Sequence, residues 1–127
     1  MQENHLFEYA VIRVVPRVER EEFLNVGVIL YCKQQKFLDA LFTLNMEKLR
    51  ILAPLTDITE VQAYLCAFEQ ICKGAAINSP IARLDIASRF RWLTATRSTI
   101  VQTSKVHQGL CRDAKETLEK LHRELVE

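Results

Sequence analysis

The chain has 127 residues, with 17 Lys or Arg and 16 Asp or Glu, which gives a net charge of +1 at pH 7. This balance excludes a general nucleic-acid coat protein, whose affinity would depend on many phosphate contacts. No apolar run approaches the roughly 20 residues that span a bilayer, and the first ten residues lack the cationic start and apolar core of a secretory signal. We therefore expect a single globular domain over residues 1–127, located in the cytoplasm and without a membrane partner.

The first structured run is Phe7–Val15, with the sequence FEYAVIRVV. It is rich in β-branched and aromatic residues and is apolar on both faces except at Glu8 and Arg13. This pattern predicts a central strand, which Pro16 ends because proline cannot donate a hydrogen bond to a neighbouring strand.

Two further strands follow the first. Asn25–Lys33 is apolar, and its Gly27 indicates a bulge or a close approach of another backbone. A short polar turn at Gln34-Gln35 then leads into Lys36–Leu44. The sequence thus predicts an antiparallel meander.

Helices come next. Asn45 is a suitable N-cap for a helix over Met46–Ala53. The run Ile58–Lys73 has apolar residues spaced by three and four, follows the capping residue Asp57, and ends at Gly74.

The last third of the chain mixes both structures. Ser88–Leu93 indicates a short helix or turn, and Thr99–Ser104 a fourth strand near a sheet edge, open to a partner or to oligomerisation. Asp113 begins a final amphipathic helix. The predicted fold is α+β, an antiparallel sheet of about four strands with helices packed on one face.

The four cysteines are expected to be free, buried thiols. They form no CxxC pair, and no histidine stands at zinc-ligand spacing from any of them. Acids and histidines do not converge at ligand spacing elsewhere, so we predict no metal and no cofactor. The positions are Cys32, Cys66, Cys72 and Cys111.

The segment Arg83–Arg112 is the most basic part of the chain. It holds six Lys or Arg and one acid, Asp85, a net charge of +5. Arg97 is followed by Ser98 and Thr99, and Arg89 and Arg91 lie upstream. Guanidinium forks beside hydroxyl groups favour a phosphate or carboxylate pocket. In the alternative interpretation these arginines pair with acids of the chain and brace the fold.

A second candidate is the long charged connection Arg17–Asn25, which carries Arg17, Arg20 and Asn25. A connection longer than a hairpin needs is a common place for a binding site. The alternative is a twisted hairpin whose charges face water.

His107 and Trp92 complete the candidates. An imidazole near arginines suits a general base or a donor to a bound anion, but the sequence reveals no catalytic partner for it. Phe90 and Trp92 alternate with Arg89 and Arg91, as in proteins that bind single-stranded nucleic acid. Packing of both aromatic side chains in the core is the alternative.

Two runs together resemble a known family. They are AVIRVVPRVEREEFLNVGVILYC, residues 10–32, and RFRWLTATRSTIVQTSKVHQGLCRD, residues 89–113. In this order they are similar to a bacterial family catalogued as domain of unknown function 3037, and the likeness covers nearly the whole chain. Its members are often encoded beside a protein similar to the HipA-type kinases, so the resemblance implies a HipA-like kinase as a protein partner. It names no reaction. The matching positions are Arg13, Pro16, Arg20, Glu22, Asn25, Val26, Gly27, Arg89, Phe90, Trp92, Leu93, Arg97, Ser98, Gln102, His107 and Gly109.

The two basic regions combine into one site hypothesis, in which eight side chains surround a single anionic group. The leading functional hypothesis is a small binding or accessory module that recognises a phosphate-bearing ligand and works with a partner protein. The alternatives are a phosphoester enzyme, with His107 as acid or base and Arg97 stabilising charge, and a nucleic-acid-binding domain. The sequence leaves open whether the protein is an enzyme. The eight residues are Arg17, Arg20, Asn25, Arg89, Arg97, Ser98, Gln102 and His107.

Overall fold

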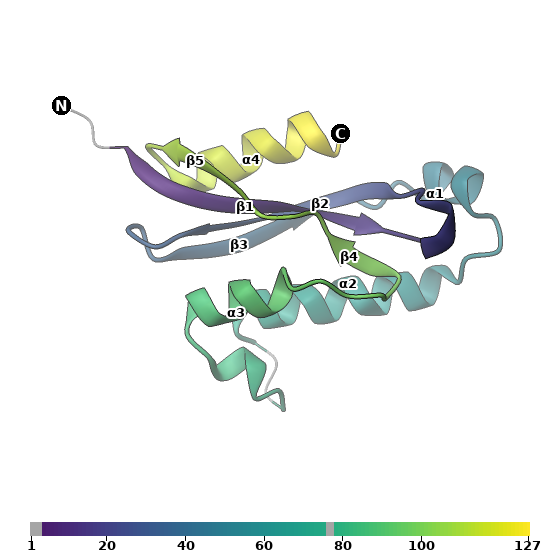
Figure 1. Cartoon of the computed structure of the whole chain (residues 1–127), viewed down its shortest axis with the longest axis horizontal. Helices are drawn as coiled ribbons and strands as arrows, with labels where there is room; N and C mark the ends of the chain where they lie inside the picture. Colours follow the sequence, from purple (N-terminus) through teal and green to yellow (C-terminus); the bar gives the residue numbers. More distant parts are fainter. Residues whose placement is uncertain (1–3, 76–77) are drawn as a thin grey trace.

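The computed structural model describes residues 4–75 and 78–127 of the chain. It has the predicted α+β architecture, an antiparallel sheet packed with helices (Figure 1). The sheet has five strands rather than about four. In chain order the elements are β1 (His5–Val14), η1 (Val18–Arg20), β2 (Leu24–Cys32), β3 (Phe37–Phe42), α1 (Met46–Leu52), α2 (Ile58–Lys73), η2 (Ile81–Arg83), α3 (Ile86–Leu93), β4 (Val101–Thr103), β5 (His107–Cys111) and α4 (Ala114–Leu125).

Strands β1, β2 and β3 form the predicted meander, and the sheet order is β3-β2-β1-β4. Strand β5, which the sequence interpretation missed, pairs with the first half of β1, and β4 pairs with the second half. Strands β4 and β5 are joined by a bulge at Ser104, where the side chain of Ser104 makes one of the hydrogen bonds to β1. Its amide donates to Val11 O at 2.8 Å, and its Oγ accepts from Val11 N at 2.9 Å. The prediction of an edge strand at β4 is confirmed.

Gly27 meets both expectations for its position. The pairing of β1 with β2 shifts by one residue between Ile12 and Arg13, next to Gly27, which marks a bulge. The backbone of β3 also approaches closely, because a Cβ on Gly27 would lie 2.7 Å from Leu41 O. A larger residue would therefore force β3 away from β2.

Helices cover both faces of the sheet, so the expectation of helices on one face is wrong. Ile12 and Ile29 point to a core shared with α2 and α3, whereas Val28 and Leu30 point to a second core against α4. Figure 1 shows α4 on one side of the sheet and α2 and α3 on the other. Both faces need cover because β1 and β2 are apolar on both.

The helix ends follow the predicted capping residues. Asn45 accepts a hydrogen bond from Lys48 N, Asp57 from Thr59 N and Glu60 N, and Asp113 from Lys115 N. Gly74 ends α2 in the left-handed conformation, with φ of 70°. These caps fix where α2 and α4 begin on the sheet.

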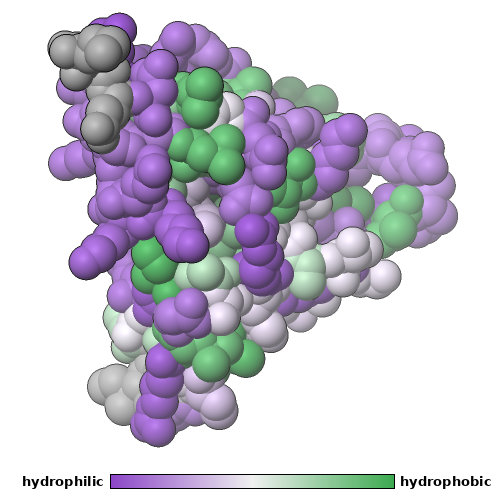
Figure 2. All heavy atoms as spheres, turned by 60° about the vertical axis from the view of Figure 1, so that its left-hand side comes forward, coloured by the Kyte–Doolittle hydropathy of each residue, from purple (hydrophilic) through white to green (hydrophobic). Residues whose placement is uncertain are grey.

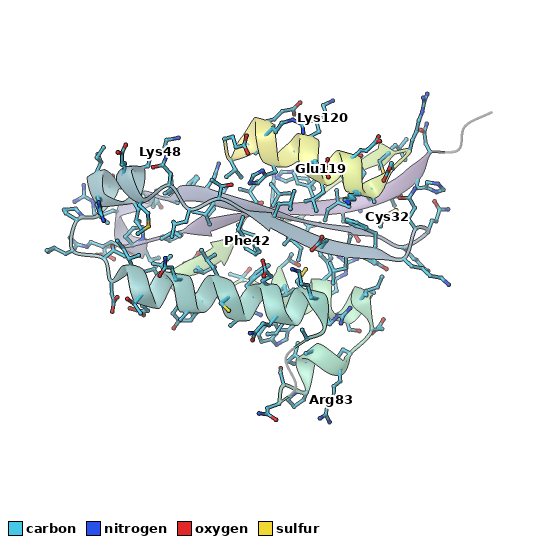
Figure 3. The ribbon with its side chains drawn as sticks, turned by 180° about the vertical axis from the view of Figure 1, so that it is seen from behind. Cys32, Phe42, Lys48, Arg83, Glu119 and Lys120 are labelled. Atoms are coloured by element: carbon cyan, nitrogen blue, oxygen red, sulfur yellow. The ribbon has the colours of Figure 1, made fainter. Side chains whose placement is uncertain are left out.

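The side of the sheet that α2 covers is held by aromatic packing. Figure 3 shows Phe42 pointing from the sheet toward α2. There its ring meets that of Phe68 edge-on, with the centroids 6.0 Å apart. No helix in the described ranges is both long and apolar enough to cross a membrane.

All four cysteines are free, but only three are buried. Cys66 is exposed because it follows the inward-facing Leu65 by one position and so lies on the outer side of α2. Burial raises the pKa of Cys72 to about 12 and also raises the pKa of Cys111. The expectation of a buried thiol is therefore wrong for Cys66.

This difference predicts selective thiol labelling. A raised pKa leaves less of the reactive thiolate at any pH below it, so Cys72 and Cys111 are doubly protected, by burial and by protonation. An aromatic disulfide reagent at pH 8 should label only Cys66 rapidly, and Cys66→Ser should remove the fast phase. Rapid labelling of a second thiol in the native protein would contradict the described packing.

Candidate functional site

Arg17 and Arg20 line a pocket of about 530 Å³ beside the start of α2. Each arginine already has an acid: Arg17 Nε lies 2.7 Å from Glu19 Oε1, and Arg20 pairs with Glu22. Three acids also line this pocket, against the two arginines. The local charge therefore does not favour an anion there.

Arg89 braces the connection between α2 and α3. Its Nη1 donates to Ala82 O at 3.3 Å, and its guanidinium lies against Gly74, where a side chain would collide with it. The Nε of Arg89 is buried and has no hydrogen-bond partner within the described residues. The position favours the bracing interpretation for this arginine.

Arg97 is folded back onto α3. Its guanidinium carbon lies 3.9 Å from the centroid of the Trp92 ring, and it donates a hydrogen bond to the carbonyl oxygen of Trp92. Burial lowers the pKa of Arg97. Phe90 is fully buried, as the core interpretation expects, whereas Trp92 remains 38% exposed. Ser98, the residue after Arg97, is exposed.

Asn25, Gln102 and His107 lie on the α4 side of the sheet. Asn25 Nδ2 donates to the carbonyl of Leu125, at the end of α4, at 3.2 Å. His107 stacks on its strand partner Tyr9, with the ring centroids 5.2 Å apart. Gln102 donates to Thr99 O at 2.9 Å. The eight predicted residues thus occupy four separate places, and the expectation of a single shared pocket is wrong.

A different pocket, which we call the end pocket, has the better composition for a ligand. It measures about 720 Å³ and lies where the start of β1, the end of β2 and the turn into β3 meet the beginning of α3. Figure 2 turns this end of the molecule forward and shows apolar groups among hydrophilic ones. Its lining residues are Leu6, Glu8, Tyr31, Lys33, Gln34, Lys36, Asp85, Ile86, Ala87 and Arg91.

The charged side chains of the end pocket favour an anion. Three cations face two acids, a net charge of +1. Arg91 is held by Glu8 through two hydrogen bonds of 3.0 and 2.8 Å, which leave three of its five N–H donors available. Lys33 and Lys36 make no ion pair within the described part of the chain. Glu8 therefore orients the arginine, while the lysines supply unbalanced charge.

Tyr31 forms part of the wall of this pocket. The residue is only 7% exposed, and its ring packs on Phe90 with the centroids 5.4 Å apart. Burial, reinforced by the charge of Glu8, raises the pKa of Tyr31, so the phenol stays protonated at neutral pH. Its hydroxyl makes no hydrogen bond within the described ranges. The side chain is thus largely buried, but its hydroxyl stays accessible from the pocket as a donor without an acceptor in the described chain.

The first turn of α3 adds backbone donors. Asp85 precedes the helix, but its side chain makes no capping hydrogen bond. The amides of Ile86 and Ala87, which line the end pocket, therefore lack the partner that a capped helix provides. Free amides at a helix N-terminus are favourable contacts for an anion.

Together the fold and this pocket define an α+β protein with a donor-rich, net positive cavity at one end of its sheet. A family model confirms the resemblance seen in the sequence: residues 9–126 match the family described as a protein of unknown function, DUF3037, and the chain belongs to that family. No curated protein and no solved structure matches it.

Of the end-pocket residues, sequence reasoning had singled out only Arg91 as a candidate for binding. Tyr31 was hidden inside an apolar strand, and Lys33 and Lys36 merely flank a turn. The available signal was the spacing of two lysines around the Gln34-Gln35 turn, next to a tyrosine at a strand end. These residues form a candidate site only because α3 packs beside them, which the sequence alone does not reveal.

The stacking of Arg97 on Trp92 predicts a structural role for this arginine. Arg97→Ala should lower the free energy of unfolding by about 0.5–1 kcal/mol, the usual value of an exposed cation–π pair. It should also change the fluorescence emission of Trp92, the one tryptophan in the chain. Ser98→Ala is the matched control and should change neither. Unaltered stability and emission in Arg97→Ala would show that the stack contributes nothing.

Proposed function

We propose that this protein is a small bacterial, cytoplasmic binding module whose end pocket recognises a phosphate-bearing ligand. The observation that carries the proposal is the hydroxyl of Tyr31, which reaches a net positive pocket from a largely buried ring and has no hydrogen-bond acceptor within the described residues. A hydrogen bond to a charged group contributes about 1.5–3 kcal/mol. A phosphate oxygen within reach of this hydroxyl would accept such a bond.

The chemistry of a phosphate monoester fits the remaining donors. Its oxygens are strong acceptors and carry nearly two negative charges at neutral pH. Lys33 and Lys36 provide opposite charge, the free N–H groups of Arg91 provide directed donors, and the α3 amides provide neutral ones. Asp85 opposes an anion, so its carboxylate limits the affinity.

The proposal includes an accessory role with a protein partner. Its support is the family resemblance, which implies a HipA-like kinase. A module that binds a phosphate group is chemically suited to work beside an enzyme that handles phosphate, and the end pocket requires no catalytic residue for this role.

The two alternatives have less support from the geometry. His107 stacks on Tyr9, on the sheet face opposite the end pocket, and is therefore poorly placed for acid–base work on a ligand there. For nucleic acid, Trp92 is partly exposed, but Arg97 covers one face of its ring at 3.9 Å. A stacked base would be limited to the other face or would have to displace that guanidinium.

Tyr31→Phe tests the proposal because it removes one oxygen and keeps the ring that packs on Phe90. Wild type should bind inorganic phosphate or a simple phosphate monoester by calorimetry, and the variant should bind about tenfold more weakly or worse, as expected for a hydrogen bond to a charged group. The ligand-free variant should be about as stable as wild type, because the removed hydroxyl makes no hydrogen bond to the described part of the chain.

Charge variants complete this experiment. Lys33→Gln with Lys36→Asn should weaken binding, and Asn suits residue 36 because its φ is 52°. Asp85→Asn should strengthen binding by removing a repulsive charge. Arg17→Ala with Arg20→Ala, in the other pocket, is the matched control and should have no effect. Equal affinity in wild type and Tyr31→Phe, or no binding by wild type, would reject the end pocket as a phosphate site.

A further inference from the structure

Strand β5 is an edge strand whose outer side carries no other strand of the described chain. Helix α4 follows it directly but packs on β2 and β3, so it does not cover this edge. Residues 107–111, HQGLC, contain no lysine, arginine, proline or acid. Natural sheets usually place such residues, a bulge or a covering element at an exposed edge, because unpaired backbone groups attract another strand.

Each of the other two edge strands has one outward backbone group bonded by a nearby side chain. On β3, the amide of Ala40 donates to Asp39 Oδ1 at 2.8 Å. On β4, the carbonyl of Val101 accepts from Thr99 Oγ1 at 2.7 Å. No comparable side-chain bond to the backbone of β5 occurs within the described residues. Strand β5 therefore exposes its edge without any such bond in the described chain.

The pairing pattern identifies which groups of β5 face outward. Val15 N donates to Ile100 O, and Ser104 N donates to Val11 O, so odd-numbered residues of β1 direct their backbone groups toward β4 and β5. Their partners in β5 are the odd-numbered residues, with Gly109 opposite Phe7. Because the direction alternates along a strand, the amides and carbonyls of Gln108 and Leu110 point outward.

We propose that β5 pairs antiparallel with β5 of a second copy of this chain, about a two-fold axis at Gly109. In this register Gln108 of each copy faces Leu110 of the other as a hydrogen-bonded pair, and all four outward groups of each strand gain a partner. The two Gly109 residues meet on the axis as a non-hydrogen-bonded pair, where side chains approach most closely and glycine presents none.

Two side-chain features favour a second copy over a foreign strand. Leu6 and Leu110 are cross-strand partners and are 53% and 67% exposed. The symmetric register brings the leucine pairs of the two copies together on one face, with the two Leu110 side chains as diagonal neighbours. The same register places Lys105 opposite Asp113 of the other copy at both ends of the pairing, so the ends are complementary in charge. A shift of one residue would instead oppose Lys105 and Arg112.

Sedimentation velocity tests the association directly. The contact is short, so we expect a weak, concentration-dependent dimer between about 10 µM and 1 mM. Leu110→Lys should weaken it at least about tenfold, since a charge would then be buried in the contact. Leu55→Lys, at a leucine that is 99% exposed on another part of the surface, is the control and should leave it unchanged. A monomer over the whole range, or a dimer unaffected by Leu110→Lys, would overturn the proposal and leave this edge to another partner.

Disulfide trapping tests the register in a Cys66→Ser background. Gln108→Cys mixed with Leu110→Cys should form a cross-linked dimer, because a hydrogen-bonded pair places the two Cα atoms about 5.5 Å apart, within disulfide range. Leu110→Cys alone should cross-link far less, since diagonal neighbours are roughly 7–8 Å apart. Equal cross-linking of the single variant and the mixture would refute the axis at Gly109.

Discussion

Burial of both faces of β1 and β2 is the constraint from which the rest of this structure follows. Ile12 and Ile29 on one face, and Val28 and Leu30 on the other, are all fully buried. Two fully apolar strand faces cannot be satisfied by one layer of helices, because the uncovered face would expose its side chains to water. The chain therefore places α2 and α3 on one side and sends α4 to the other, with β4 and β5 as the connection between them.

The crossing from one side to the other determines where the end pocket lies. Helix α3 is only eight residues long and cannot cover the whole of its sheet face. The end of the sheet where β1 begins and β2 ends therefore stays open. At that end Glu8 is opposite Tyr31 in the strand register, and it binds Arg91 from α3. The ion pair thus fixes the helix beside the sheet, where the ring of Tyr31 packs on Phe90 and its hydroxyl lines the cavity. The donor-rich end pocket therefore exists because α3 covers this face of the sheet incompletely.

The sequence was sufficient for the elements with local signals and insufficient for those decided by tertiary packing. Asp57 and Gly74 marked both ends of α2, because capping depends on a few neighbouring residues. The side on which α4 packs was not readable in the same way, although the doubly apolar β1 required a second layer. The arginines misled for a similar reason: whether Arg89 and Arg97 bind a ligand or brace the fold depends on what lies beside them, here Ala82 and Trp92. The density of charged residues along the sequence does not reveal which neighbours an arginine has in the fold.

The end pocket and the open edge of β5 are two consequences of the same uncovered region. Leu6 lines the pocket and is also the strand partner of Leu110, so one side chain belongs to both surfaces. A second copy paired through β5 would extend the sheet beside Leu6 without touching Tyr31, which lies one strand further in, on β2. Pairing would then shield the apolar rim from water and leave the polar donors accessible. In the two proposals the contacts differ, so the hydroxyl of Tyr31 would govern ligand affinity alone and Leu110 would govern association alone.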